Sequence, residues 1–466
     1  MVFSLLLGWK GVNVLSRRMV IGKCQKKELV LLLAVCLIPA CQADEGDNLT
    51  YGISKFYDGM TYGVVNGTTS KIVQIVYIPS YRQITVPGSS SKWYQIRGIG
   101  EQAFINCSNL TDIIFRSEKL LRIDRKSFDH CTKLKSIVIP EYVREIGNAA
   151  FNGCWSLESV TLSDSLRRIA DAVFEGCSKL ESVTFPDSLQ VVGIYAFHKC
   201  TGLKNMIINK GLTTIDSCAF LDCSGLKSVE FGSSLKSIGR SAFRGCVKLE
   251  AAFFPSSLTQ IKTHAFYGCS SLGTVVFSRN LTELAPYAFS NCTGLKTISF
   301  PESKSKLSIR SHVFENCTCL TTIDIHDNVF RIYDNAFKNC ISLPTITLPA
   351  SMSAIGESAF EGCVSLDTVI SLVETPFQLE KDVFKNISPK SVLVVPYSKK
   401  NSYIAAGWTE EIFRGGIVEL PDPLSGISSV KVRKGNKKWY DLDGHEITVL
   451  EKGRIYIRDG KKIRLK

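Results

Sequence analysis

Hydrophobic and polar positions repeat along most of this chain with a period of 23 residues. Between Ile169 and Leu180, apolar side chains stand at Ala172, Phe174 and Cys177, and mostly polar residues separate them. The phenylalanine recurs at Phe151, Phe197, Phe220, Phe243, Phe266 and Phe289. The cysteine recurs at Cys107, Cys131, Cys154, Cys200, Cys223, Cys246, Cys269, Cys292, Cys317, Cys340 and Cys363, each three residues before a leucine.

A repeat of this length with fixed leucine and cysteine positions is typical of a leucine-rich-repeat solenoid. A solenoid buries its core between neighbouring coils, so it grows without adding separate domains. The length of 466 residues therefore does not require the three domains that it would otherwise suggest.

Residues 157–179 show the elements expected in one coil. Val160, Thr161 and Leu162 alternate apolar, polar and apolar, which indicates a strand with Thr161 facing outward. The Ala-Phe-x-x-Cys-x-x-Leu unit has a spacing near three, which favours a short helical or 3₁₀ turn. The predicted fold class is therefore an α+β solenoid, a right-handed stack of coils with short strands and short helical or 3₁₀ turns, capped by β modules.

Two structural expectations follow for the stack. Equivalent side chains of successive coils should lie about 4.8 Å apart, the spacing of neighbouring strands, so the phenylalanines should form a buried ladder. Gly147, Gly239 and Gly356 follow an isoleucine at the same place in their coils. A glycine there predicts a corner with positive φ.

Composition shifts divide the chain into five parts. Period-2 segments separated by turn residues predict strands before the repeats, and Pro421 to Gly426 has the composition of a linker. We predict a signal peptide with lipobox in 1–41, an N-terminal β cap in 42–98, a solenoid of about 12–13 repeats in 99–391, a C-terminal cap in 392–420 and a small basic β tail module in 421–466.

The first 41 residues have the pattern of an export signal. The apolar run Leu29–Pro39 follows a lysine-rich segment and is too short for a permanent transmembrane helix. The start at Met1 or Met19 stays open. Ile38-Pro39-Ala40-Cys41 resembles a bacterial lipobox, which implies lipidation of Cys41 and a membrane anchor. Plain secretion after Ala40 or Ala43 is the alternative.

The net charge of +13 lies mainly at the two ends of the chain. Residues 1–41 carry about +5 and residues 430–466 about +7, which leaves the solenoid close to neutral. Nucleic-acid binding needs a basic face on the folded body. The composition therefore predicts no nucleic-acid partner.

The cysteine ladder raises the question of disulfides or a metal. In-register side chains with one rotamer keep their sulfurs about a strand spacing apart, far beyond the ~2.05 Å of a disulfide. We therefore expect reduced, buried thiols, with a disulfide ladder as the alternative. The close pairs Cys317/Cys319 and Cys218/Cys223 lack neighbouring histidines, and no catalytic or phosphate-binding motif occurs. We predict no metal, no cofactor and no enzymatic activity.

The unit Ile-Gly-x-x-Ala-Phe-x-x-Cys-x-x-Leu-x-x-Val-x-Leu-Pro resembles the BspA-like leucine-rich-repeat family over about 290 residues. This resemblance implies a bacterial cell-surface protein, anchored in the outer membrane or exposed on the cell as a lipoprotein. It also implies adhesion to an extracellular protein or glycan of the host matrix or of another bacterium. No ligand-binding residues carry over, because the motif residues belong to the core.

The outward residue at the strand centre is the position that the repeat leaves free to vary. The candidate ligand face is Ile207, Glu230, Phe253, Val276 and Ser299. An exposed apolar strip on a solenoid favours a partner surface, although β-propensity alone would also explain these residues. The predicted function is an adhesin that binds protein or cells, and a structural spacer without a specific ligand is the alternative.

Overall fold

The computed structural model describes residues 49–55, 61–68, 73–85, 90–303 and 305–421, and four short strands between 439 and 464. The predicted signal peptide and Cys41 lie outside these residues. Within the described part, no helix combines the length and apolar character needed to cross a bilayer.

Five strands precede the repeats. They are β1 (Leu49–Lys55), β2 (Thr61–Thr68), β3 (Ile75–Ile78), β4 (Tyr81–Ile84) and β5 (Lys92–Ile99). The first two pair antiparallel, and β2 then pairs parallel with β5. Since β3 pairs with β6 (Asp112–Phe115) and β5 pairs with β7 (Arg122–Ile123), both strands of the repeats, these segments are continuous with the stack.

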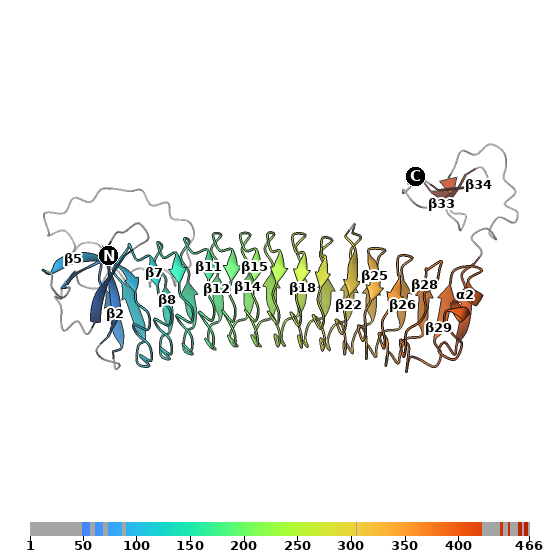
Figure 1. The fold of residues 1–466 in the computed structure, drawn as a ribbon, viewed down its shortest axis with the longest axis horizontal. Helices are drawn as coiled ribbons and strands as arrows, with labels where there is room; N and C mark the ends of the chain where they lie inside the picture. The colour runs from blue at the N-terminus through green and yellow to red at the C-terminus, as the bar shows by residue number, and fades with distance from the viewer. Residues whose placement is uncertain are drawn as a thin grey trace, which may run out of the picture. The chain divides into compact units, whose positions relative to one another are not determined.

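The repeats form a β-solenoid of about 14 stacked turns, in which consecutive coils lie side by side (Figure 1). Each coil contributes a strand to row A, which follows the Cys-x-x-Leu segment. Row A contains β6 (Asp112–Phe115), β8 (Ser136–Val138), β10 (Ser159–Thr161), β12 (Ser182–Thr184), β14 (Asn205–Ile207), β16 (Ser228–Glu230), β18 (Ala251–Phe253), β20 (Thr274–Val276), β22 (Thr297–Ser299), β24 (Thr322–Asp324), β26 (Thr345–Leu348) and β28 (Thr368–Ser371).

Row B is the second row of strands and precedes the Ala-Phe-x-x-Cys turn. It contains β7 (Arg122–Ile123), β9 (Glu145–Ile146), β11 (Arg168–Ile169), β13 (Val191–Val192), β15 (Thr214–Ile215), β17 (Ser237–Ile238), β19 (Gln260–Ile261), β21 (Glu283–Leu284), β23 (Leu307–Ile309), β25 (Val329–Ile332) and β27 (Ala354–Ile355). Where strands of a row pair, the pairing is parallel and, apart from one shift between β23 and β25, in register, as between Val160 and Val183. Equivalent residues of successive coils therefore lie next to each other.

The last coil is covered by β29 (Val392–Val395), α2 (Lys400–Ala405) and β30 (Gly416–Glu419). Trp408 and Phe413 lie against the ring of Phe384, with centroids 5.6 and 5.2 Å from it. The buried Tyr403 hydroxyl contacts the Ser371 hydroxyl at 2.6 Å and donates to the carbonyl of Val373 at 2.7 Å. These contacts keep water from the apolar end of the stack.

Four further strands form a separate sheet in the order β32-β31-β33-β34. They are β31 (Trp439–Tyr440), β32 (Glu446–Ile447), β33 (Ile455–Arg458) and β34 (Lys461–Arg464). The last two pair antiparallel as a hairpin, which fits the alternation of Ile455, Ile457 and Ile463 in the sequence.

The core of the stack is a continuous ladder of phenylalanine rings from Phe104 to Phe384. Successive rings are stacked with centroids 5.0 to 5.8 Å apart and planes within 21° of parallel. Most of these rings are fully buried. This arrangement confirms the predicted ladder. The distance of about 5 Å between ring centroids lies in the range that stacked aromatic pairs favour.

The prediction of an α+β fold with short helical or 3₁₀ turns is not confirmed. Among the described residues the single α-helix is α2, and the Ala-Phe-x-x-Cys unit is a series of tight turns. The residues two before and two after each phenylalanine have positive φ, as at Ala172 (56°) and Gly176 (74°). Left-handed residues on both sides of Phe174 interrupt a helix, although i→i−3 bonds such as Cys177 N–H to Phe174 O (3.1 Å) remain.

The turns are joined by hydrogen bonds between coils. The N–H groups of Ala172, Phe174 and Gly176 donate at 2.8 Å to three carbonyls of the next coil, those of Ile194, Ala196 and His198. The left-handed conformation turns alternate N–H groups toward the same neighbour. The turn therefore satisfies its backbone through the next coil, as a strand does.

The prediction of positive φ at Gly147, Gly239 and Gly356 is wrong, since none of the three has it. The reason for glycine there is steric. A Cβ at Gly147 would lie 2.5 Å from the Arg125 nitrogen, and one at Gly239 would lie 2.5 Å from the Asp216 carbonyl carbon. In these coils the successive backbones approach too closely to admit a side chain, whereas other coils carry one at the equivalent place, as at Ala170 and Lys262.

The ladder cysteines from Cys154 to Cys363 are buried, reduced thiols. Each donates a weak hydrogen bond to the phenylalanine carbonyl of the preceding coil, as from Cys200 Sγ to Phe174 O at 3.1 Å. The corresponding distances along the ladder are 3.0 to 3.4 Å. Burial raises the pKa of Cys154, Cys177, Cys200, Cys223, Cys246, Cys269, Cys317, Cys340 and Cys363, to about 12 for Cys363, so these nine thiols stay protonated and donate.

The phenylalanine ladder predicts a large, position-specific loss of stability. Phe266→Ala removes a fully buried ring that stacks on both neighbours, and it should lower the free energy of unfolding by about 3–5 kcal/mol. Phe253→Ala is the control, because that ring is 62% exposed and its loss should change stability by about 0.5 kcal/mol or less. Denaturant unfolding followed by circular dichroism measures both, and equal effects would contradict the ladder.

The thiol ladder predicts selective alkylation. Iodoacetamide should modify the exposed Cys319 in the native protein and leave Cys200 and Cys246 unmodified, since burial protects them and raises their pKa values. In denaturant without reductant, every cysteine from Cys154 to Cys363 should react. Peptide mass spectrometry identifies the labelled sites. A ladder cysteine that reacts only after reduction would show a disulfide instead.

Candidate ligand-binding face

Row A presents two outward side chains in each coil. In β14, Asn205 and Ile207 point outward, while Met206 between them is buried. The same alternation holds in β8, β10, β12 and β16. It follows from the pleat, which directs successive side chains to opposite faces.

The candidate ligand-face residues lie in register on this face. Ile207 pairs with Glu230 between β14 and β16, and Phe253, Val276 and Ser299 pair in turn through β18, β20 and β22. The two groups belong to separate ladders, since β14-β16 and β18-β20-β22-β24 are distinct sheets. The structure thus brings Phe253, Val276 and Ser299 together in one sheet and places Ile207 and Glu230 in the next.

The exposed apolar side chains of this set are large for a surface position. Ile207 is 67% exposed, Phe253 62% and Val276 36%. Phe254, directly after Phe253, points inward and lies 5.6 Å from the core ring of Phe266. The packing of Phe254 in the core therefore holds the backbone of β18 in place, and with it the position of Phe253 on the surface.

Sequence reasoning missed the other outward position, which is the first residue of each row A strand. From β8 onward its residues are small and mostly polar: Ser136, Ser159, Ser182, Asn205, Ser228, Ala251, Thr274, Thr297, Thr322, Thr345 and Thr368. The period-2 alternation used for the candidate residues also identifies this column. The short side chain of Ala251 in this column leaves the Phe253 ring beside it exposed.

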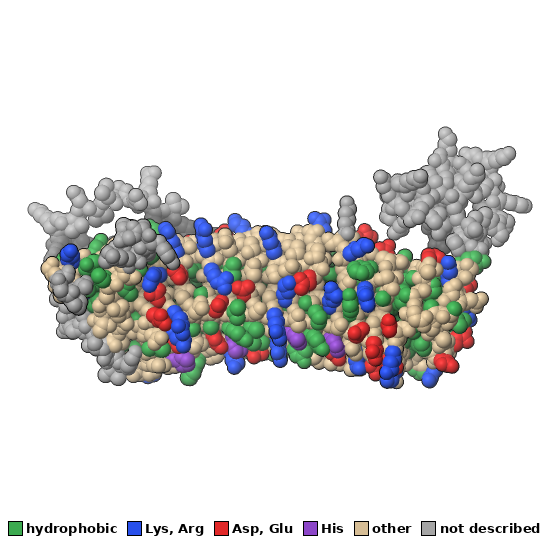
Figure 2. Space-filling model, in the orientation of Figure 1, with side chains coloured by type: hydrophobic (Ala, Val, Ile, Leu, Met, Phe, Trp, Pro, Cys, Tyr) green, Lys and Arg blue, Asp and Glu red, His purple; other side chains and the backbone are tan. Residues whose placement is uncertain are grey.

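A charged depression borders row A on the side of the Cys-x-x-Leu segment. It has a volume of about 590 Å³ and is lined by Lys179, Lys204, Lys227, Lys248, Glu158 and Glu181, among others. Glu181 and Lys204 form an ion pair at 2.8 Å. Figure 2 shows acidic and basic side chains interspersed over the visible face of the stack. This polar border is suited to orienting a partner that contacts the apolar residues.

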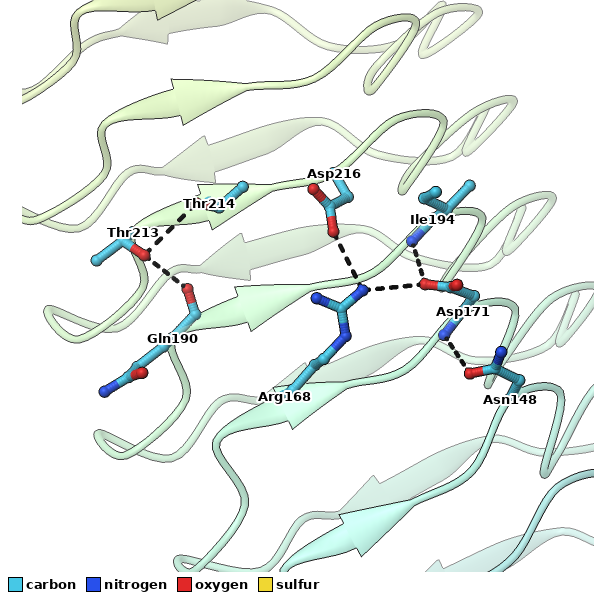
Figure 3. Close-up of polar contacts among 8 residues, drawn as sticks. All are labelled: Asn148, Arg168, Asp171, Gln190, Ile194, Thr213, Thr214 and Asp216. Carbon is cyan, nitrogen blue, oxygen red and sulfur yellow. Dashed lines mark hydrogen bonds and ion pairs between the residues drawn. The ribbon is translucent and has the colours of Figure 1, made fainter.

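A polar network connects coils along row B (Figure 3). The Arg168 guanidinium donates to Asp171 at 3.1 Å in its own coil and to Asp216 at 3.2 Å two coils away. The same Asp171 oxygen accepts the Ile194 N–H at 3.0 Å. Because these groups are solvent-exposed, each ion pair contributes at most about 1 kcal/mol. We assign the network to fastening coils.

An aromatic column lies at the left-handed position before the core phenylalanines. The rings of His264, Tyr287 and His312 stack with centroids 4.8 and 4.3 Å apart, and all three residues have φ near 60°. Burial lowers the pKa of His264, and the positive charges of Arg244 and Arg240 lower it further. The imidazole of His264 that stacks on Tyr287 is therefore neutral at physiological pH.

No group of three or more His, Cys, Asp or Glu side chains in the described segments could hold a metal ion. Four histidines, His130, His198, His312 and His326, instead pair with carboxylates, as His198 Nδ1 does with Glu175 at 2.9 Å.

Two parallel strand rows, a phenylalanine core and a repeat of 23 residues define a leucine-rich-repeat solenoid with an exposed strand face. The family described as BspA type Leucine rich repeat region (6 copies) matches residues 97–215, 190–308 and 307–406, well over half of the chain. The chain therefore belongs to the BspA-type leucine-rich-repeat family, as its repeat unit predicts. No curated protein matches the sequence significantly.

Several solved structures are similar in fold. A leucine-rich repeat protein from Bacteroides ovatus is 24% identical with a TM-score of 0.48, and the match covers 81% of this chain and 100% of that one. A leucine rich cell surface protein from Faecalibacterium prausnitzii is 24% identical with a TM-score of 0.40, covering 72% and 95%. The pneumococcal vaccine antigen PcpA is 19% identical with a TM-score of 0.39, covering 81% and 98%.

Proposed function

We propose that this protein is a non-catalytic, cell-surface binding protein, an adhesin whose row A face attaches to an extracellular protein or glycan. The single observation that carries the proposal is the exposed apolar pair Phe253 and Val276, joined in register between β18 and β20. Exposed apolar clusters with polar borders mark interaction sites, and aromatic side chains are frequent among the residues that dominate binding.

The chemistry of the face supports attachment rather than catalysis. Its outward residues are serine, threonine and scattered apolar or charged side chains, held on parallel strands. A partner can cover several coils at once, because equivalent positions repeat at the strand spacing. Affinity then accumulates over many small contacts, with Phe253 supplying the largest apolar area.

Export and anchoring complete the proposal. The pattern of residues 1–41 supports passage through a membrane, and the lipobox-like sequence before Cys41 supports a lipid anchor. An anchored stack would present its strand face to the surroundings of the cell. We place the protein at the outer membrane or cell surface, with secretion as the alternative.

The strand face predicts a specific loss of binding. A pull-down against matrix proteins, glycans and neighbouring bacteria identifies the ligand, and the double variant Phe253→Ser, Val276→Ser should then weaken its binding about tenfold or more. The physical reason is the loss of apolar area that only the complex buries. Unchanged unfolding midpoints verify that the stack is intact.

Val138→Ser is the matched control, because Val138 holds the same strand position in β8 and is also 62% exposed. Binding of this variant should equal that of the unchanged protein. Full binding by the Phe253→Ser, Val276→Ser variant would exclude these two residues from the ligand-binding face. Failure to capture any ligand would favour a structural spacer.

The anchor predicts a change in cell fractionation. Cys41→Ser removes the thiol that would carry the lipid, so the protein should move from the membrane fraction to the soluble fraction of cells that export it. Cys36→Ser is the control, because the bulky Val35 precedes this cysteine where a lipobox has a small residue, and it should leave the distribution unchanged. Membrane association that persists in Cys41→Ser would exclude this anchor.

A further inference from the structure

Hydrogen bonds between the turns repeat through twelve successive coils and then end. In each coil, three alternate N–H groups of the Ala-Phe-x-x-Cys turn donate to three alternate carbonyls of the next coil. The series begins with Gln102, Phe104 and Asn106 and ends with Ser358, Phe360 and Gly362. The last acceptors are the carbonyls of Lys381, Val383 and Lys385, at 3.1, 2.9 and 2.9 Å.

The next three groups of the series are the N–H groups of Asp382, Phe384 and Asn386, which we call the open edge. Within the described residues, none of the three has an acceptor. Asp382 and Asn386 have φ of 56° and 59°, and the Phe384 ring continues the ladder 5.4 Å from Phe360. The open edge therefore has the geometry of the twelve turns that do bind a neighbour.

The C-terminal cap covers the ring of Phe384 but leaves a depression beside its turn. Trp408 and Phe413 pack on the ring. The depression has a volume of about 530 Å³, and its lining includes the open edge together with Leu379, Ile387 and Ile412. These three apolar residues are only partly buried. The depression thus combines three donors with an apolar floor.

The geometry fixes the kind of group that fits. An extended polypeptide presents the carbonyl of every second residue on one side. The carbonyls that accept hydrogen bonds from the preceding coil, those of Lys381, Val383 and Lys385, also belong to every second residue. Unpaired strand-like edges bind extended peptides through their main chains, with side-chain pockets supplying specificity. Alternate apolar side chains of such a peptide would contact Ile387 and Ile412.

Charge at the rim selects among peptides. The carboxylates of Glu380 and Glu411 line the depression and form no ion pair within the described part of the chain. Asp382, in contrast, pairs with Lys385 at 3.3 Å. Arg414 is the remaining cation of the lining, so Glu380 and Glu411 leave an excess of negative charge. A complementary partner carries lysine or arginine between its apolar residues.

We propose that the open edge is a second binding site, which takes an extended basic-apolar peptide segment of another protein as an additional coil-like strand. Three N–H groups bind three carbonyls of the segment, and Glu380 and Glu411 bind its cations. This site lies outside the row A face and does not depend on the adhesin proposal. The two can therefore fail separately.

Amide hydrogen exchange of the full chain tests the site. The probe is a blocked hexapeptide of alternating valine and lysine, added at about 1 mM so that weak binding is still seen. Exchange at Asp382, Phe384 and Asn386 should slow by about tenfold or more, because each N–H gains an acceptor. Exchange at Ser358, Phe360 and Gly362, which already donate to the next coil, should not change.

Charge variants separate this site from general attraction. Glu380→Lys with Glu411→Lys should weaken peptide binding about tenfold or more, whereas Glu250→Lys, on an exposed residue of a distant coil, should not. A valine–glutamate hexapeptide should not bind the unchanged protein measurably. Unchanged exchange at the open edge, or equal binding of both hexapeptides, overturns the proposal. Slow exchange at the open edge in the free protein also overturns it, because a second copy or other residues of the chain would then already cover these N–H groups.

Discussion

The in-register contact between one Ala-Phe-x-x-Cys turn and the next is the constraint on which the rest of this structure depends. The Phe174 ring stacks on its neighbours at 5.7 and 5.4 Å, while its backbone N–H donates to the following coil at 2.8 Å. Both contacts are met only if every coil, 23 to 25 residues long, returns to the same place. Successive coils therefore lie close together. This close approach excludes a Cβ at Gly147 and brings the thiol of each ladder cysteine within hydrogen-bond distance of a phenylalanine carbonyl of the preceding coil.

The sequence predicts the positions of the core but not the conformation of the turn. Phe174, Cys177 and Leu180 are buried as their periodicity indicates. A spacing near three fits a 3₁₀ helix and also fits a turn with left-handed residues on both sides, because both place these side chains on one side. The discriminating signal is the residue two after the phenylalanine. It is often glycine or asparagine, as at Gly176 and Asn291, and both types tolerate positive φ.

For the candidate ligand face, too, the sequence predicts one property and not another: it predicts which side chains are exposed but not what they bind. Alternation correctly predicts that Phe253 is exposed and that its neighbours point inward, since the pleat is local. Whether Phe253 contacts a partner depends on molecules outside the chain, which no period encodes. The open edge was missed for a related reason. Replacement of the ladder cysteine by Ile387 shows where the repeat ends, but not which backbone groups the cap leaves without acceptors.

A solenoid separates the residues that build it from those that are free to act. Each coil contacts only its neighbours, so a change at an outward residue such as Phe253 leaves distant coils unaffected. The ladder residues have no such freedom, because the Phe174 carbonyl already accepts both the Cys177 N–H and the Cys200 thiol at 3.1 Å. New binding chemistry can therefore arise at two kinds of place. One is the outward strand positions, where side chains vary. The other is an end of the stack, where the backbone itself has donors left over, and Asp382, Phe384 and Asn386 form such an end.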